Sequence, residues 1–343
     1  MPLPTRALLA ASLSALIAVP VATLAEGAEV NVYSARKEDL IKPLLDRFTA
    51  QTGIRVNLVT GKEDALLTRL QSEGDSSPAD LLVTTDAGRL YRAQAAGVTQ
   101  AVSSTALEAA IPATYRDPDG HWFGLSLRAR PILYVQGRVD PSSLSTYEAL
   151  AEPQWKGKIC IRSSDSIYNQ SLVASLIAAD GEEATETWAK GLVANLAKPP
   201  QGGDRDQIKA AAAGQCDLAI ANTYYLAGML RSADTAEQAA ASQMGVFWPN
   251  QAGRGAHVNV SGAAVTKAAK RKSEAIQLLE FMATPESQAW YAQANGEYPV
   301  VPGVGVGETL AAWGPFKADT LNLARLGELN GEAARLMDRA GWK

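Results

Sequence analysis

The sequence has few of the side chains that build most metal and catalytic sites. It contains only two histidines and two cysteines in 343 residues. No histidine-rich ligand set, no ordered serine, histidine and aspartate, and no carboxylate pair beside its paired tyrosines can be found. These absences argue against a secreted metalloenzyme, and we expect no enzymatic activity.

Positive charge is also scarce. Lysine and arginine number 32 against 36 aspartates and glutamates, for a formal net charge of −4. The longest basic run, Lys270-Arg271-Lys272, has three charges, too few to line a groove. Nucleic acid is therefore not an expected partner.

Long apolar runs are absent except at the start of the chain. Residues 7–24 are apolar, follow Arg6, and lead to small residues ending at Ala25. This pattern is typical of a secretory signal peptide, here residues 1–25, and Pro20 argues against the alternative of a membrane anchor. Loss of the segment removes only Arg6 among charged residues, which changes the net charge from −4 to −5.

The two cysteines, Cys160 and Cys216, each stand at the start of a candidate strand. An even pair in an exported protein favours a disulfide over two buried thiols. Two thiols alone do not make a metal site.

Strand and helix patterns alternate along the chain, and its length suits two domains. The first part predicts strands at residues 30–33, 55–59 and 80–84, with helices at 38–50, 62–73 and 86–95. Such alternation predicts an α/β fold in which each lobe is a doubly wound, mostly parallel sheet flanked by helices.

Two extended segments are candidates for strands that cross between the lobes. Residues 121–135 contain Arg128 and Arg130, and residues 257–265 lead back. We therefore expect a first lobe of residues 26–127 plus about 258–300, a second lobe of 128–257, and a C-terminal helical segment of about 301–343 packed on the lobes.

Four tyrosines stand where a strand gives way to a helix. Tyr224 and Tyr225 follow the apolar run 218–221, Tyr168 follows the strand at 158–162, and Tyr33 ends the first strand. A tyrosine pair by itself is most simply a packing feature. Ligands of open α/β sheets, however, gather outside the carboxyl ends of strands, so these phenols could meet in a cleft between the lobes.

A cluster of phenols favours a hard, highly charged cation. Phenolate is a hard oxygen donor, and tyrosine ionises near pH 10 when unperturbed, so a strong local cation is required. Ferric iron is the obvious candidate. Four phenolates and Fe³⁺ sum to −1, and a nearby arginine would offset this charge. Arg128 is the best placed, with Arg130 and Arg36 as further candidates.

The chain resembles the periplasmic ferric-iron-binding proteins of ABC transporters, in particular those with a tyrosine-rich site. The resemblance extends over essentially the whole mature chain. It is densest at Val32–Arg36, Ser77–Leu81, Ile167–Ser171, Ala221–Tyr225 and His257–Gly262. The Asn-Thr-Tyr-Tyr element is the most specific of these, because Ser-Pro-Ala-Asp occurs more widely in binding proteins of this fold.

The resemblance implies a two-lobed type II periplasmic-binding fold. It also implies a periplasmic protein, expected to be a monomer, that closes on iron and delivers it to an ABC permease. The implied metal ligands are Tyr33, Tyr168, Tyr224 and Tyr225, and Arg128 is implied to balance their charge without touching the metal.

The sequence departs from some relatives of this kind. Those relatives have a histidine beside the first strand and a glutamate after the Pro-Ala-Asp strand. Here Ser34–Lys37 contains no histidine and Thr84–Asp86 contains no glutamate. Water or an anion such as carbonate is then expected to complete the coordination. The main alternative keeps the fold but binds an oxyanion or an organic cation, and a metalloenzyme is the less favoured one.

Overall fold

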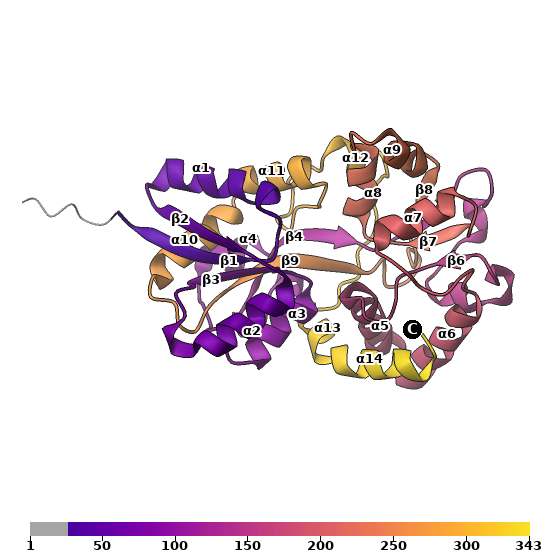
Figure 1. Cartoon of the computed structure of the whole chain (residues 1–343), viewed down its shortest axis with the longest axis horizontal. Helices are drawn as coiled ribbons and strands as arrows, with labels where there is room; N and C mark the ends of the chain where they lie inside the picture. Colours follow the sequence, from indigo (N-terminus) through magenta and orange to yellow (C-terminus); the bar gives the residue numbers. More distant parts are fainter. Residues whose placement is uncertain (1–26) are drawn as a thin grey trace, which may run out of the picture.

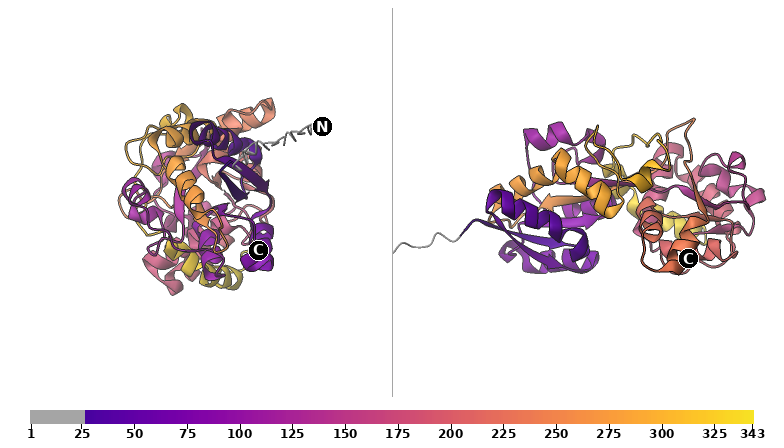
Figure 2. Two further views of the ribbon diagram at one scale, coloured as in Figure 1. Left: turned by 90° about the vertical axis from the view of Figure 1, so that its left-hand side faces the viewer. Right: turned by 90° about the horizontal axis from the view of Figure 1, so that it is seen from above.

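The computed structural model describes residues 27–343. The described residues form two α/β lobes that lie side by side and are joined by extended segments, as Figures 1 and 2 show. The predicted two-lobed α/β fold is therefore confirmed. The predicted signal peptide, residues 1–25, lies outside the described residues.

The first lobe is built on a five-stranded sheet with the strand order β2-β1-β3-β9-β4. Its strands are β1 (Glu29–Ser34), β2 (Arg55–Thr60), β3 (Leu81–Thr85), β4 (Phe123–Ala129) and β9 (Val258–Val265). Its helices are α1 (Lys42–Thr52), α2 (Glu63–Glu73), α3 (Ala87–Ala95), α4 (Thr105–Ala110), α10 (Lys272–Met282) and α11 (Pro285–Asn295).

Helix α1 shows how the sequence pattern produces this packing. Leu44, Leu45 and Phe48 recur at helical spacing and are buried against the sheet. The expected helix over residues 38–50 is split, because a separate 3-10 turn (Glu38–Leu40) comes first and α1 begins with Pro43 in its first turn. Proline is tolerated there because its missing N–H has no partner in a first turn.

The second lobe is built on a four-stranded sheet with the order β6-β7-β5-β8. Its strands are β5 (Ile132–Val135), β6 (Ile159–Cys160), β7 (Leu218–Ile220) and β8 (Met244–Phe247). Its helices are α5 (Ile167–Asp180), α6 (Glu182–Ala194), α7 (Asp204–Ala212), α8 (Thr223–Leu230) and α9 (Thr235–Ser242). Three 3-10 helices lie between β5 and β6: Pro141–Ser143, Glu148–Ala151 and Pro153–Trp155. Two others, Gly74–Ser76 and Ala113–Tyr115, come earlier in the chain, before β4.

Both sheets are mixed, whereas the sequence predicted mostly parallel ones. Strand β1 is parallel to β2 and β3, and β6 is parallel to β7. Strand β9 is antiparallel to both β3 and β4, and β5 is antiparallel to both β7 and β8. The antiparallel pairs arise because the chain crosses from β4 directly into β5 and returns from β8 into β9 (Figure 1).

The C-terminal segment contributes α12 (Glu308–Ala311), α13 (Ala324–Glu328) and α14 (Asn330–Arg339). Helix α13 packs against α3 of the first lobe and α5 of the second, and α14 packs against α5 and α6. Near the chain end, the buried Trp342 donates from Nε1 to the Arg162 carbonyl (2.9 Å). The segment therefore covers the junction between the lobes.

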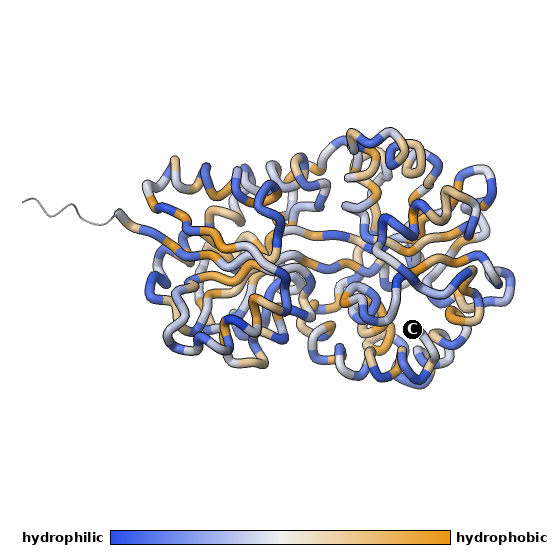
Figure 3. Tube along the Cα trace, in the orientation of Figure 1, coloured by the Kyte–Doolittle hydropathy of each residue, from blue (hydrophilic) through white to orange (hydrophobic). Residues whose placement is uncertain are grey.

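The strands carry the apolar core of each lobe, whereas polar residues concentrate on the outer turns (Figure 3). Cys160 and Cys216 form a disulfide, which confirms the predicted bridge. Both are buried with Leu133 and Ala219 in the core of the second sheet. Among residues 27–343, no helix has the length and apolar character needed to span a membrane.

Removal of the disulfide should destabilise the protein. The two cysteines are 56 residues apart, and releasing a loop of that size increases the entropy of the unfolded chain, which lowers the free energy of unfolding by about 4 kcal/mol at 25 °C. The double variant Cys160→Ala/Cys216→Ala should show this loss in urea unfolding. A reductant should lower the midpoint of the wild type and leave the variant unchanged. An identical midpoint for both proteins in oxidising buffer would contradict a stabilising bridge.

Candidate functional site

The paired tyrosines lie in the first turn of α8, as their position after a buried strand predicted. Leu218–Ile220 form β7, which is fully buried, and α8 begins at Thr223. The Asn222 side chain does not cap α8. Its Oδ1 instead accepts a hydrogen bond from Arg130 (2.9 Å). The junction between β7 and α8 is thus held by the side chain of Arg130, which lies in the segment that crosses between the lobes.

Tyr168 meets this pair from the first turn of α5. The Tyr224 hydroxyl donates to the Tyr168 hydroxyl at 3.1 Å, and the rings of Tyr224 and Tyr225 lie 4.3 Å apart between centroids. The structure therefore brings three of the four candidate tyrosines into one cluster, which we call the tyrosine cluster: Tyr168, Tyr224 and Tyr225.

The tyrosine cluster lines an open cleft of about 780 Å³ between the lobes. The first lobe contributes several polar and charged side chains to the same cleft: Arg36, Lys37, Glu63, Thr85, Ser261 and Glu297. Sequence reasoning missed Glu63 and Glu297 as cleft residues. Glu63 opens an ordinary surface helix and Glu297 follows the end of α11, so neither carries a local signal for a binding site.

Tyr33 does not join the cluster, and the expectation that it faces the cleft is wrong. Its ring is buried, and its hydroxyl donates to the carboxylate of Glu73 (2.9 and 3.1 Å). The guanidinium of Arg69 lies over the ring, 4.6 Å from the centroid. Successive side chains of a strand point to opposite faces, and Tyr33 points to the face that α2 covers. The turn after β1 reaches the cleft through Ala35, Arg36 and Lys37 instead.

Arg128 lies beside the tyrosine cluster and is buried. Its Cζ is 5.7 Å from the centroid of the Tyr168 ring, and its Nη1 donates to Ser261 (3.1 Å). Its Nη2 is 3.8 Å from an Asp86 carboxylate oxygen, too far for a hydrogen bond. Among the described residues, Nε and Nη2 have no hydrogen-bond partner. Arg128 therefore retains positive charge that can act on the cluster.

The other two candidate arginines are committed to buried ion pairs. Arg36 makes a two-pronged contact with Glu297, at 2.7 and 3.3 Å. Arg130 donates to Asp204 (2.8 Å), to Asn222 and to Asn169 (2.7 Å). Both guanidiniums have their own carboxylate partner, so Arg128 is the candidate best able to offset a charged cluster.

Burial favours the protonated form of Tyr224 and Tyr225 when no cation is bound. It raises the pKa of Tyr224 well above the usual range, and the neighbouring Tyr168 and Tyr225 raise that pKa further while Arg128 lowers it. Burial likewise raises the pKa of Tyr225, and the charges of Tyr168 and Asp204 add to this. A cation that binds here as a phenolate complex must therefore displace protons.

The two histidines of the sequence, His121 and His257, are not members of the tyrosine cluster. Burial, followed by the charges of Arg130, Arg128 and Arg254, lowers the pKa of His257 to about 3, which makes it a neutral structural residue. His121 shares a hydrogen bond with Thr99 (2.9 Å). Within residues 27–343, no group of three or more histidine, cysteine, aspartate or glutamate side chains is arranged to hold a metal ion.

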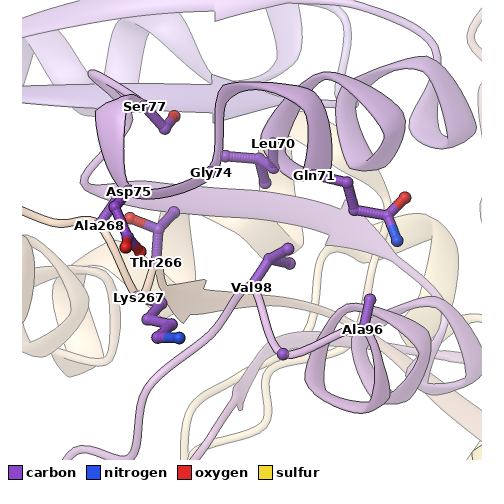
Figure 4. Close-up of a pocket in the computed structure, with 11 residues that line it drawn as sticks. Leu70, Gln71, Gly74, Asp75, Ser77, Ala96, Val98, Thr266, Lys267 and Ala268 are labelled. Atoms are coloured by element: carbon purple, nitrogen blue, oxygen red, sulfur yellow. The ribbon is translucent and has the colours of Figure 1, made fainter.

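A second cavity, of about 270 Å³, lies in the first lobe beside the end of α2 (Figure 4). Its only charged lining residues are Asp75 and Lys267, and no tyrosine reaches it. Neither the tyrosine cluster nor Arg128 takes part in this cavity, so the cleft is the candidate site.

Two lobes joined by crossing strands, with a polar cleft between them, define a ligand-binding protein of the periplasmic-binding type. A family model described as bacterial extracellular solute-binding protein matches residues 44–318. The chain belongs to this family.

Several relatives of this chain have names that refer to iron. Iron uptake protein A1 of Synechocystis sp. is 51% identical over 94% of this chain and 89% of that protein. A solved structure from Trichodesmium, described as in complex with iron and citrate ligands, is 52% identical with a TM-score of 0.90, over 92% of this chain and all of that chain. The structure of apo FutA2 from Synechocystis is 46% identical with a TM-score of 0.89, over 93% and 100%.

The buried contacts of Arg130 should stabilise the second lobe strongly. Arg130→Ala leaves Asp204 with only Arg162 as a charged partner (3.0 Å) and Asn169 and Asn222 without their donor. Breaking a buried pair in this way costs about 3–5 kcal/mol, measurable by urea unfolding. Lys42→Ala, which removes an exposed pair with Asp46, is the control and should leave the midpoint nearly unchanged. Equal midpoints for the two variants would contradict this role.

Proposed function

We propose that this protein captures ferric iron in the cleft and delivers it to an ABC permease for uptake. The observation that carries the proposal is the tyrosine cluster, in which Tyr168, Tyr224 and Tyr225 meet at one end of the second sheet. Three convergent phenols suit a hard cation, because each supplies a hard oxygen once its proton is lost.

The charges of the proposed site nearly balance. Three phenolates and one Fe³⁺ sum to zero, compared with −1 for the four-tyrosine set expected from the sequence. Arg128 then contributes positive charge beside Tyr168, partly offset by Asp86. In the proposed complex, one Fe³⁺ replaces three phenol protons, so the net charge of the site does not change. Arg128 favours the ionised form of the phenols without touching the metal.

Three phenolates leave part of the coordination shell of iron open. Water, an anion such as carbonate, or a cleft side chain of the first lobe would complete it. Such a first-lobe contact would couple iron binding to closure of the lobes. Glu63 is a candidate, since its carboxylate lines the cleft and has only long contacts with Thr85 (3.4 Å) and Arg89 (3.6 Å).

The names of the relatives support iron as the ligand. Besides iron uptake protein A1, the major ferric iron-binding protein of Neisseria meningitidis is 28% identical over 98% of this chain. We infer an iron carrier without enzymatic activity, exported by its signal peptide to the periplasm and working as a monomer with its permease. The alternative ligands, an oxyanion or an organic cation, would not explain why three phenols converge at this site.

Ferric iron should colour the protein, because phenolate-to-iron charge transfer absorbs visible light. Iron-free protein titrated with iron(III) citrate should develop a visible band that saturates at one iron per chain. Tyr224→Phe and Tyr225→Phe should each weaken or shift the band. A protein that stays colourless, with no thermal stabilisation by iron, would contradict the proposal.

Tyr33→Phe is the matched control for those variants. It also removes a phenol hydroxyl, but one that hydrogen bonds to Glu73 under α2 rather than facing the cleft. Its band and iron affinity should equal those of the wild type. Bleaching of the band by Tyr33→Phe would instead restore the four-tyrosine site that the sequence suggested.

Iron affinity should fall as the pH falls. Burial raises the pKa of Tyr224 and Tyr225 in the iron-free protein, so both are protonated at neutral pH and lose their protons when iron binds. Each proton displaced changes the apparent affinity about tenfold per pH unit, with tighter binding at higher pH. Competition against a chelator of known pH dependence measures this slope. Both phenols are protonated in the iron-free protein between about pH 6 and 8, well below the usual pKa of tyrosine. An iron affinity that does not change over this range would show that Tyr224 and Tyr225 do not ionise when iron binds.

A further inference from the structure

Asp86 has an unusual backbone conformation at the junction of the lobes. It follows β3 and caps α3, accepting a hydrogen bond from the Gly88 N–H (2.9 Å). Its φ angle is +80°, a region that residues other than glycine rarely adopt. Such strain persists only where surrounding contacts hold the residue firmly, and it is concentrated at functional sites.

The contacts that hold Asp86 come from both lobes. Its side chain is fully buried, and Oδ2 accepts a hydrogen bond from Asn259 of β9 (2.9 Å). Its Oδ1 accepts one from Ser171 of α5 (2.7 Å), which is a helix of the second lobe. This bond links the first-lobe helix α3 to the helix that carries Tyr168, one turn before Ser171.

Side chains of α5 reach the start of α3 at this link. A Cβ atom added to Gly88 would lie 3.3 Å from Cδ1 of Ile167, 3.1 Å from Oδ1 of Asp86 and 3.7 Å from Oγ of Ser171. Helix α13 packs against both α3 and α5 on the same side of the molecule (Figure 1). Helix α5 is therefore tied to the first lobe by the Ser171–Asp86 hydrogen bond and by its packing against α13.

The link also borders the charged groups around the tyrosine cluster. One narrow polar space joins Asp86 to Tyr168 and Arg128. Its complete lining is Asp86, Arg128, Arg130, Tyr168, Asn222, His257 and Asn259. A shift of α5 relative to Asp86 would thus move Tyr168 with respect to both Arg128 and Tyr224.

We propose that Asp86 and Ser171 are positioning residues for the tyrosine cluster. Their hydrogen bond across the lobes fixes the start of α5, and with it the Tyr168 hydroxyl, at the place where it meets Tyr224. The inference rests on the proposed iron function. Neither residue contacts the metal. The link acts by holding one ligand in position before iron arrives, which lowers the entropy lost on binding.

Ser171→Ala tests the link with little change in volume. It should weaken iron binding about tenfold in competition with nitrilotriacetate, the scale of one hydrogen bond to a charged group, and shift the visible band. Ser175→Ala is the matched control. Ser175 is buried on the same helix, but its hydroxyl bonds only to the Leu172 carbonyl (2.7 Å). This control should keep the band and the affinity of the wild type.

Asp86→Ala and the double variant Asp86→Ala/Ser171→Ala complete the test. If both residues act through one bond, the double variant binds iron no more weakly than Asp86→Ala alone. Fully additive losses would overturn the proposal, as would a Ser171→Ala variant that matches Ser175→Ala in affinity and band. A wild-type protein that shows no iron band would overturn the iron function and this inference together.

Discussion

One buried guanidinium organises the second lobe around the cleft. Arg130 leaves the crossing segment and reaches Asp204, Asn222 and Asn169, which stand at or beside the N-termini of α7, α8 and α5. Asp204 also accepts from the backbone N–H of Asn222 (3.1 Å). A buried charge is tolerated only when it is paired and hydrogen bonded, so these helix ends are drawn to one point. Tyr168, Tyr224 and Tyr225 converge because their helices begin there.

The chemistry of the cleft follows from burial and charge. Phenols are easily kept neutral inside a protein, and a trivalent cation is one of the few ligands able to displace their protons. Arg128 lies beside the Tyr168 ring, and two of its guanidinium nitrogens have no hydrogen-bond partner among the described residues, whereas Arg36 is paired with Glu297. The first lobe supplies Asp86, whose contacts span both lobes. The helix that carries Tyr168 therefore contacts both the tyrosine cluster and the first lobe.

The sequence predicts what depends on local pattern. Alternating strands and helices indicated the two lobes, and a tyrosine pair after a buried strand indicated a site at a helix start. Tyr33 was misplaced because the end of a strand is visible in the sequence, whereas the face to which its side chain points depends on the covering helix. Glu297, the partner of Arg36, is 261 residues away in the sequence, and no local pattern predicts a contact over that separation. The same holds for the bond between Asp86 and Ser171.

Resonance Raman spectroscopy of the iron-loaded protein tests the central claim most directly. Excitation within the visible band enhances vibrations of the groups that bind the metal. Tyrosinate ring modes should dominate the spectrum, decrease in Tyr168→Phe, Tyr224→Phe and Tyr225→Phe, and remain unchanged in Tyr33→Phe. Iron bound without tyrosinate modes would contradict an account in which the tyrosine cluster holds the metal.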